Sequence, residues 1–134
     1  MNLDRRQLLR CLCFLPALGL ARSPARARAQ GTERHLALNV FSVAGFQYYR
    51  GPELLPSFVA GQPLSLIAEP KNAHDEFAVR IEWRGQKIGY VPRSDNKHLS
   101  RLLHQQIRLE GRIAEVREND APWRTLKVEV GMRG

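Results

Sequence analysis

The stretch VRIEWRGQKIGYVPR, residues 79–93, predicts two antiparallel strands joined by a tight turn. Apolar and charged residues alternate over 79–83, which is the pattern of a strand with one buried face. The sequence Arg-Gly-Gln at 84–86 predicts the turn, and residues 87–91 form the returning strand. The stretch therefore indicates a β domain whose strands each turn one face to a core.

Alternating patterns recur on both sides of this hairpin. Three further sets of apolar residues predict strands: Leu36, Leu38 and Val40; Ile107, Leu109 and Ile113; Leu126, Val128 and Val130. A helix is expected over 94–104, with Ser94 as its N-cap, and residues 51–60 have room for a helical turn. Short strands, frequent turns and one or two short helices predict a mainly β, partly open small barrel.

Inward-facing positions of the predicted strands define a core. The residues that share this inward phase are Leu38, Val40, Leu66, Val79, Ile81, Ile88, Leu109, Ile113 and Val128. The remaining chain after residue 29 is about 105 residues long, which suffices for one small domain with one core.

The first 29 residues have the layout of an export signal. A charged start with Arg5 and Arg6 leads into a short apolar run over 11–21, followed by Ala-x-Ala cleavage sites at 25–29. The segment DRRQLLR resembles the twin-arginine export motif, with an ordinary secretory signal as the alternative. The apolar run is about eleven residues, shorter than the ~20 of a spanning helix. We also expect no stable membrane insertion of the mature chain. We expect cleavage near Ala29/Gln30 and a periplasmic or otherwise exported product.

Removal of this leader changes the charge of the chain. The full sequence has 21 Lys+Arg and 13 Asp+Glu, and residues 1–29 hold six of the arginines and one aspartate. The mature chain keeps 15 basic and 12 acidic residues, a net charge of +3 instead of +8. Both cysteines, Cys11 and Cys13, also lie in the leader, which excludes disulfides and thiolate metal sites from the mature chain. A high isoelectric point alone therefore does not indicate nucleic-acid binding.

Three motifs stand in a fixed order: VAGFQYYRG at 43–51, GQPLSLIAEPKNAHDEFAVRI at 61–81 and GQKIGYVPR at 85–93. Together they resemble the HIRAN domain family over residues of about 40 to 130. The resemblance implies a six-stranded, OB-like barrel with one or two short helices, and a single HIRAN-like domain over 30–134. It also implies a non-catalytic module that binds single-stranded DNA at a free 3′ end, without a cofactor.

The resemblance also assigns roles to residues. Tyr48 lines the DNA groove and Tyr49 supports it from the barrel side. Asp75 accepts a hydrogen bond from a nucleotide 3′-hydroxyl, with Asn72 as a polar contact nearby; the alternative is that both only stabilise their own turn. His74 stands where relatives have a stacking aromatic residue.

Further positions complete the expected interface. Gln47 stands where relatives have an arginine, and Arg93 is the phosphate-binding candidate, with an ion pair to Glu69 or Asp95 as its alternative. Lys71 and Lys97 add positive charge to the same face. Trp123 is either a second stacking ring or, more commonly for a lone tryptophan, part of the core. The expected nucleic-acid-binding set is Gln47, Tyr48, Asn72, His74, Asp75, Tyr90, Arg93 and Trp123.

Enzymatic activity is the least favoured class. The sequence has no paired carboxylates, no nucleophile beside a base and no glycine-rich phosphate loop, and its four histidines have no metal-ligand spacing. The main alternative to DNA binding is an exported barrel that uses the same groove for a protein or peptide, because chromosomal DNA is absent from the periplasm.

Export by the twin-arginine route is testable with the paired variant Arg5→Lys/Arg6→Lys. We expect this variant to accumulate inside the cell as an uncleaved precursor, because the receptor of the twin-arginine export route recognises the two arginines. Fractionation and immunoblotting measure the result. Normal export of the variant would contradict the route but not the presence of a signal.

Overall fold

The computed structural model describes residues 34–133, and the predicted export signal at 1–29 lies outside them. This part of the chain forms six strands: β1 (His35–Ser42), β2 (Pro63–Ala68), β3 (Val79–Trp83), β4 (Gln86–Tyr90), β5 (Leu109–Val116) and β6 (Leu126–Arg133). Its helical elements are α2 (Gly51–Leu54), α3 (Arg93–His104) and the 3-10 turns η1 (Phe46–Tyr48), η2 (Leu55–Ser57) and η3 (Pro122–Arg124). The predicted mainly β fold with short helices is confirmed.

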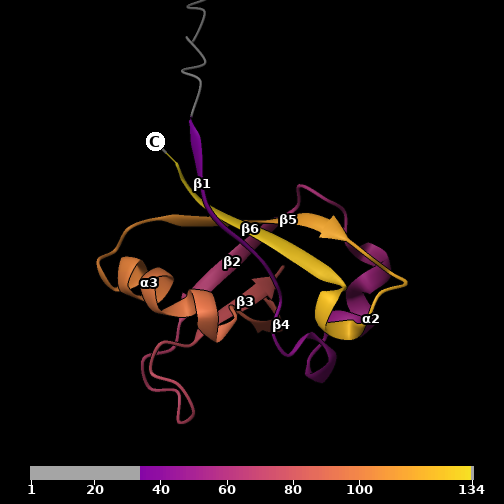
Figure 1. The fold of residues 1–134 in the computed structure, drawn as a ribbon, viewed down its shortest axis with the longest axis horizontal. Coiled ribbons are helices and arrows are strands. Elements are labelled where there is room, and N and C mark those ends of the chain that lie inside the picture. The colour runs from indigo at the N-terminus through magenta and orange to yellow at the C-terminus, as the bar shows by residue number, and fades with distance from the viewer. Residues whose placement is uncertain (1–33, 134) are drawn as a thin grey trace, which may run out of the picture. The chain divides into compact units, whose positions relative to one another are not determined.

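The strands form one antiparallel sheet in the order β1-β6-β5-β2-β3-β4. β5 and β6 pair along most of their lengths, whereas β2 and β5 pair through only two residue pairs. β1 and β4 are the two edge strands, and a backbone bridge between Ala44 and Tyr90 connects the segment after β1 to β4. The sheet thus forms a partly open barrel, with α3 and α2 toward opposite ends in Figure 1.

The bridge between Ala44 and Tyr90 depends on a glycine. The two residues exchange backbone hydrogen bonds, each 2.9 Å long. Next to Tyr90, Gly89 has φ 152°, and a Cβ there would lie 2.6 Å from the Ala44 oxygen and 2.4 Å from Val43 Cγ1. A side chain at position 89 would therefore push the segment after β1 away from β4.

The β3–β4 hairpin has the turn that its sequence predicts. Trp83 pairs with Gln86, and the two residues between them, Arg84 and Gly85, have φ of 47° and 76°. Two consecutive residues in the left-handed region match the right-handed twist of the flanking strands. This hairpin fixes the position of Tyr90 at the end of β4.

The core collects the inward-facing residues of the strands. Its largest fully buried side chains are Phe46, Ile81, Ile88, Leu99, Ile113 and Leu126. The ring of Phe58 packs edge-on against Trp83, with 5.3 Å between the ring centroids. Of the nine predicted core residues, Val79, Ile81, Ile88, Ile113 and Val128 are buried, and Leu38, Leu66 and Leu109 are partly buried against the same cluster.

The placement of Val40 in the core is wrong. Its side chain is 57% exposed, and the neighbouring Phe41 is buried instead. The pairing of β1 with β6 shifts register between Ala37 and Asn39. Such a bulge adds one residue to the strand and reverses which side chains face inward. The alternation read from Leu36 to Val40 therefore does not continue through the strand.

Helix α3 confirms the predicted helix, but its start differs. The helix begins at Arg93, with Pro92 at the capping position and no side-chain cap. Ser94, expected as the N-cap, lies in the first turn and donates a hydrogen bond to Asp95 Oδ2 at 2.7 Å. The helical turn expected within 51–60 is present as α2 and η2. No helix within residues 34–133 is long and apolar enough to cross a membrane.

The inward and outward positions can be tested with a matched pair of substitutions. Val79→Asp would bury an unpaired charge in a position with 0% exposure, and we expect it to unfold a domain with ~5–15 kcal/mol of stability. Val40→Asp places the same charge on an exposed face and should change stability by only about 0.5 kcal/mol. Thermal unfolding followed by circular dichroism distinguishes them. Equal melting temperatures for the two variants would contradict this packing.

Candidate functional site

A cavity of about 260 Å³ opens beside the bridge between the segment after β1 and β4. It is lined by Ala44, Tyr49, Asn72, His74, Asp75, Ala78, Tyr90, Val91, Arg93 and Asn96. These residues come from the η1 region, the loop at 69–78, the end of β4 and the first turns of α3. The cavity thus lies where four segments distant in sequence converge.

The loop at 69–78 is held in shape by its own polar side chains. The Oδ1 atom of Asn72 accepts hydrogen bonds from the backbone N–H groups of His74 at 2.9 Å and Asp75 at 3.3 Å. Its Nδ2 donates to Glu69 Oε1 at 3.1 Å. This is the turn-stabilising role that asparagine commonly has, and it fixes the backbone positions of His74 and Asp75.

Asp75 connects the loop to α3. Its Oδ1 accepts from the Phe77 N–H at 2.9 Å, and its Oδ2 accepts from Asn96 Nδ2 at 2.7 Å. Arg93 Nε lies 3.7 Å from the same Oδ2. A carboxylate has about four acceptor positions, so these contacts leave capacity for a further donor. The carboxylate is therefore fixed in the cavity wall and still able to accept a hydrogen bond from a ligand.

Arg93 is a cation that lines the cavity next to Asp75. Its side chain is 76% exposed, and one terminal nitrogen donates to the His74 carbonyl at 3.2 Å. The ion-pair partner is Asp75, not the Glu69 or Asp95 considered from the sequence. The guanidinium has five N–H donors, so the remaining ones are open to an anionic group.

Two aromatic rings form a further wall of the cavity. The rings of Tyr49 and Tyr90 meet edge to face, with 5.8 Å between centroids. Lys87 Nζ lies 4.3 Å from each ring centroid and donates to the Tyr90 hydroxyl, which in turn donates to Glu69 Oε1 at 2.8 Å. The second oxygen of Glu69 accepts from Arg80 at 3.2 Å. This chain of contacts fixes both rings relative to the loop.

The same contacts shift three pKa values. Burial alone would raise the pKa of Glu69, but hydrogen bonds from Tyr90 and Asn72 and the charges of Lys87 and Arg80 hold it below its ordinary value. Burial alone would lower the pKa of Lys87, and its contacts with Tyr90 and neighbouring charges raise it instead. Burial raises the pKa of Tyr90, opposed by the hydrogen bond from Lys87. At neutral pH Lys87 and Glu69 are therefore charged, and Tyr90 is neutral.

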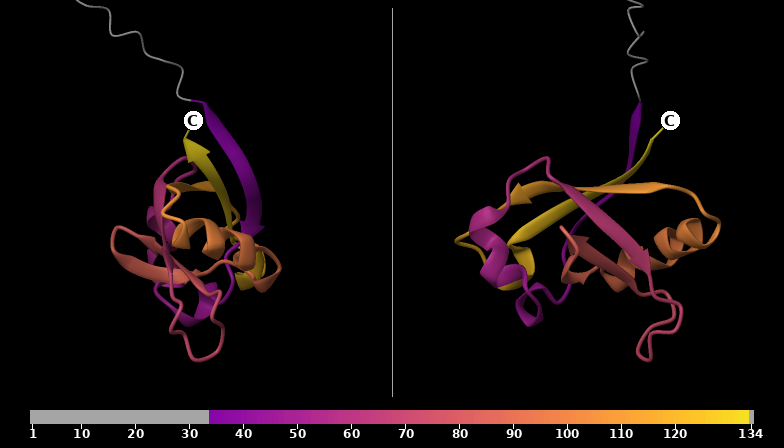
Figure 2. Two further views of the ribbon diagram at one scale, coloured as in Figure 1. Left: turned by 90° about the vertical axis from the view of Figure 1, so that its left-hand side faces the viewer. Right: turned by 180° about the vertical axis from the view of Figure 1, so that it is seen from behind.

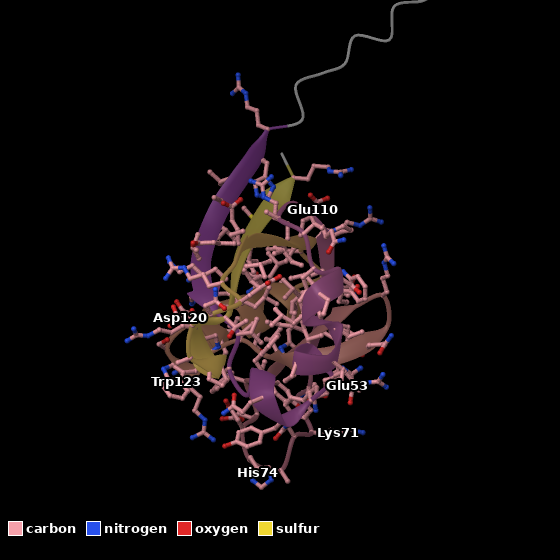
Figure 3. The ribbon with its side chains drawn as sticks, turned by 90° about the vertical axis from the view of Figure 1, so that its right-hand side faces the viewer. Glu53, Lys71, His74, Glu110, Asp120 and Trp123 are labelled. Carbon is pink, nitrogen blue, oxygen red and sulfur yellow. The ribbon has the colours of Figure 1, made fainter. Side chains whose placement is uncertain are left out.

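Five of the eight expected interface residues line the cavity: Asn72, His74, Asp75, Tyr90 and Arg93. Gln47, Tyr48 and Trp123 are exposed and do not line it. The groove expected to contain Tyr48 together with Asp75 and Arg93 is thus lined by Tyr49 in place of Tyr48. Figure 3 shows Lys71 and His74 at the tip of the molecule opposite the start of β1, and Trp123 on the side near Asp120.

Exposed rings remain outside the cavity. Tyr48 is 78% exposed and Trp123 is 60% exposed, so the more common core role of a lone tryptophan does not apply here. The turn η3, which carries Trp123, packs against η1, which carries Tyr48. The two rings therefore belong to one aromatic region next to the cavity-lining segment.

The residues expected for the interface did not include Asn96, and Tyr49 was expected only to support the groove. Asn96 is only 4% exposed and lies on the same helix face as Leu99 and Leu103. A polar residue on an otherwise apolar helix face was the available signal, since a buried amide needs a partner. The role of Tyr49 had no comparable signal, because it depends on the contact with Tyr90 forty-one positions later.

Within residues 34–133 no group of histidine, cysteine, aspartate or glutamate side chains is arranged to hold a metal ion. The cavity instead holds the Asp75 carboxylate, which can accept a further hydrogen bond, next to one exposed guanidinium and beside an aromatic wall. Such a set can bind a ligand that has a hydroxyl, an anionic group and a flat ring. The fold and cavity thus define a small β-barrel binding domain.

The chain belongs to the HIRAN domain family, whose model matches residues 38–132. This is a family of DNA-binding domains, and a HIRAN domain alone is a non-catalytic binding module. A crystal structure of a Lactobacillus plantarum protein is similar, with a TM-score of 0.64 and 23% identity over 74% of this chain and 95% of that one. The HIRAN domain of human HLTF has a TM-score of 0.60 and 17% identity over 75% of this chain and 79% of that one. A comparison with curated proteins finds no match.

The partly buried contacts around Glu69 predict a pH dependence of stability. The folded-state pKa of Glu69 lies below its ordinary value of 4.5, so its carboxylate stabilises the fold above that pH and the contribution is lost as pH falls through the folded pKa. We expect Glu69→Gln to cost about 1–3 kcal/mol at neutral pH. The gap between wild type and variant should close as the pH falls from about 6 to 3 in urea unfolding experiments.

The control for this prediction is Glu118→Gln, at an exposed glutamate that has no ion pair among the described residues. This variant should follow the wild type at every pH. A gap for Glu69→Gln that stays constant down to acid pH would show that the carboxylate charge does not stabilise the loop.

Proposed function

We propose that the domain binds a single-stranded DNA end, with the terminal 3′-hydroxyl donating a hydrogen bond to Asp75. The observation that carries the proposal is the fixed carboxylate of Asp75 in the cavity wall, with Arg93 beside it. A carboxylate in this position accepts a hydrogen bond from a hydroxyl and repels a phosphate. This arrangement favours a chain end over a continuous strand.

The dimensions and the wall of the cavity support the same ligand. A cavity of about 260 Å³ is close to the lower limit of ligand pockets, ~300–1,000 Å³, and suits one nucleotide better than a duplex. The Tyr49 and Tyr90 rings and the exposed His74 offer surfaces on which a base can stack, worth ~1–3 kcal/mol for each base. Stacking is insensitive to sequence, so we expect little preference among bases.

Charge sets the expected strength of binding. Arg93 is the exposed cation in the cavity lining, and Gln47 contributes no charge where an arginine was expected by resemblance. Each phosphate neutralised in a single strand adds about −0.7 to the logarithmic salt slope. With one phosphate bound by Arg93, the slope for the cavity alone is therefore about −0.7, and binding is weak at physiological salt.

Discrimination between chain ends tests the role of Asp75. Wild type should bind a short oligothymidylate with a free 3′-hydroxyl more tightly than the same oligonucleotide with a 3′-deoxy or 3′-phosphate end. Asp75→Asn should lose most of this preference, about 1–3 kcal/mol, because the charge-assisted hydrogen bond is removed. Fluorescence anisotropy at low salt measures the affinities.

The control is Asp95→Asn, which changes a carboxylate of α3 that hydrogen-bonds Asn39 and Ser94 rather than the cavity residues. It should keep the preference for a free end. Equal binding of free and blocked ends by wild type, or no binding at all, would contradict the proposal. Peptides and cell-wall fragments would then be the next ligands to test, in keeping with the proposed export of the chain.

A further inference from the structure

Helix α3 carries a row of cations that starts at the cavity. Arg93, Lys97 and Arg101 are spaced four residues apart and all are exposed. Four residues of an α-helix rise about 6 Å, so the row extends roughly 12 Å along the helix. The buried residues Asn96, Leu99 and Ser100 anchor the adjoining face of the same helix. The row therefore has a fixed direction relative to the cavity.

A second hollow connects the row to the cavity. It has a volume of about 320 Å³ and is lined by His74, Asp75, Phe77, Arg93, Asn96 and Lys97. All of these except Phe77 and Lys97 also line the cavity. Lys97 Nζ lies 5.3 Å and Arg101 Cζ 5.8 Å from the centroid of the Phe77 ring. Figures 1 and 2 both show the loop at 69–78 beside α3. The cavity thus continues onto a cationic and aromatic surface.

The outer two cations of the row are not neutralised by any residue within 34–133. Neither Lys97 nor Arg101 forms an ion pair with any of the described residues. The acidic residue of the first helical turn, Asp95, faces the other flank, where it accepts a hydrogen bond from Asn39 of β1 at 2.8 Å. Across the barrel, by contrast, Arg112 is paired with Glu129. The positive charge along α3 is available to a ligand.

We propose that the bound strand leaves the cavity along α3 and that its next phosphates contact Lys97 and Arg101. This inference rests on the proposed function, since it extends the same site from the terminal nucleotide to about four nucleotides. Two added phosphate contacts contribute about −1.4 to the logarithmic salt slope for a single strand. Affinity should then rise with oligonucleotide length and level off once the row is covered.

The test is a length series of oligothymidylates from two to eight nucleotides, each with a free 3′-hydroxyl, titrated at low and moderate salt. For wild type we expect affinity to increase up to about four nucleotides and then to remain constant. Lys97→Gln/Arg101→Gln should bind the dinucleotide as wild type does and the tetranucleotide about tenfold more weakly, with a shallower salt slope. Arg34→Gln/Arg84→Gln removes the same charge outside both hollows and should behave as wild type.

The outcomes separate this inference from the proposed function. Failure of every oligonucleotide to bind contradicts the proposed function and the α3 path together. Binding of the dinucleotide without any gain at greater length overturns the α3 path alone. An equal loss in both double variants would show a general effect of charge and overturn it as well. Loss of the length dependence in Tyr48→Ala/Trp123→Ala instead would place the strand over the other aromatic region and also overturn it.

Discussion

The backbone bridge between Ala44 and Tyr90 is the contact on which the rest of the site depends. It is possible because Gly89 has no Cβ to collide with the Ala44 oxygen. The bridge holds the segment after β1 against β4, which places Tyr49 edge-on to Tyr90. Without it, the barrel would open between its edge strands and the cavity would lose its aromatic wall.

Polar contacts then fix the remaining walls in a ready-made arrangement. Lys87, Tyr90 and Glu69 join β4 to the loop at 69–78, and Asp75 and Asn96 join that loop to α3. Partly buried hydrogen bonds of this kind are costly to leave incomplete, so the loop has little freedom to rearrange. A site organised before binding loses less conformational entropy when a ligand enters.

The local distribution of charge affects what this domain can bind more than its net charge does. Most of the excess of basic residues lies in the first 29 residues, and the remainder of the chain is only slightly basic. Several arginines of the barrel are paired with carboxylates, as Arg80 is with Glu69 and Glu82. Lys97 and Arg101 lie next to the cavity and form no ion pair within residues 34–133, so they have a larger influence on ligand choice than the isoelectric point suggests. Such a distribution agrees better with the proposed weak binding of a DNA end than with indiscriminate binding to nucleic acid.

The sequence by itself determined the hairpin over 79–91, the helix near 94–104 and the polar loop with Asn72 and Asp75, because each depends on local alternation, helical spacing or turn chemistry. Tertiary structure decided the rest. A bulge in β1 turned Val40 outward, since strand pairing resets the phase of alternation. The choice of Tyr49 over Tyr48 as a cavity wall, and the pairing of Asn96 with Asp75, arise between segments far apart in sequence. Such contacts depend on how the barrel closes, and no local pattern of residues encodes that closure.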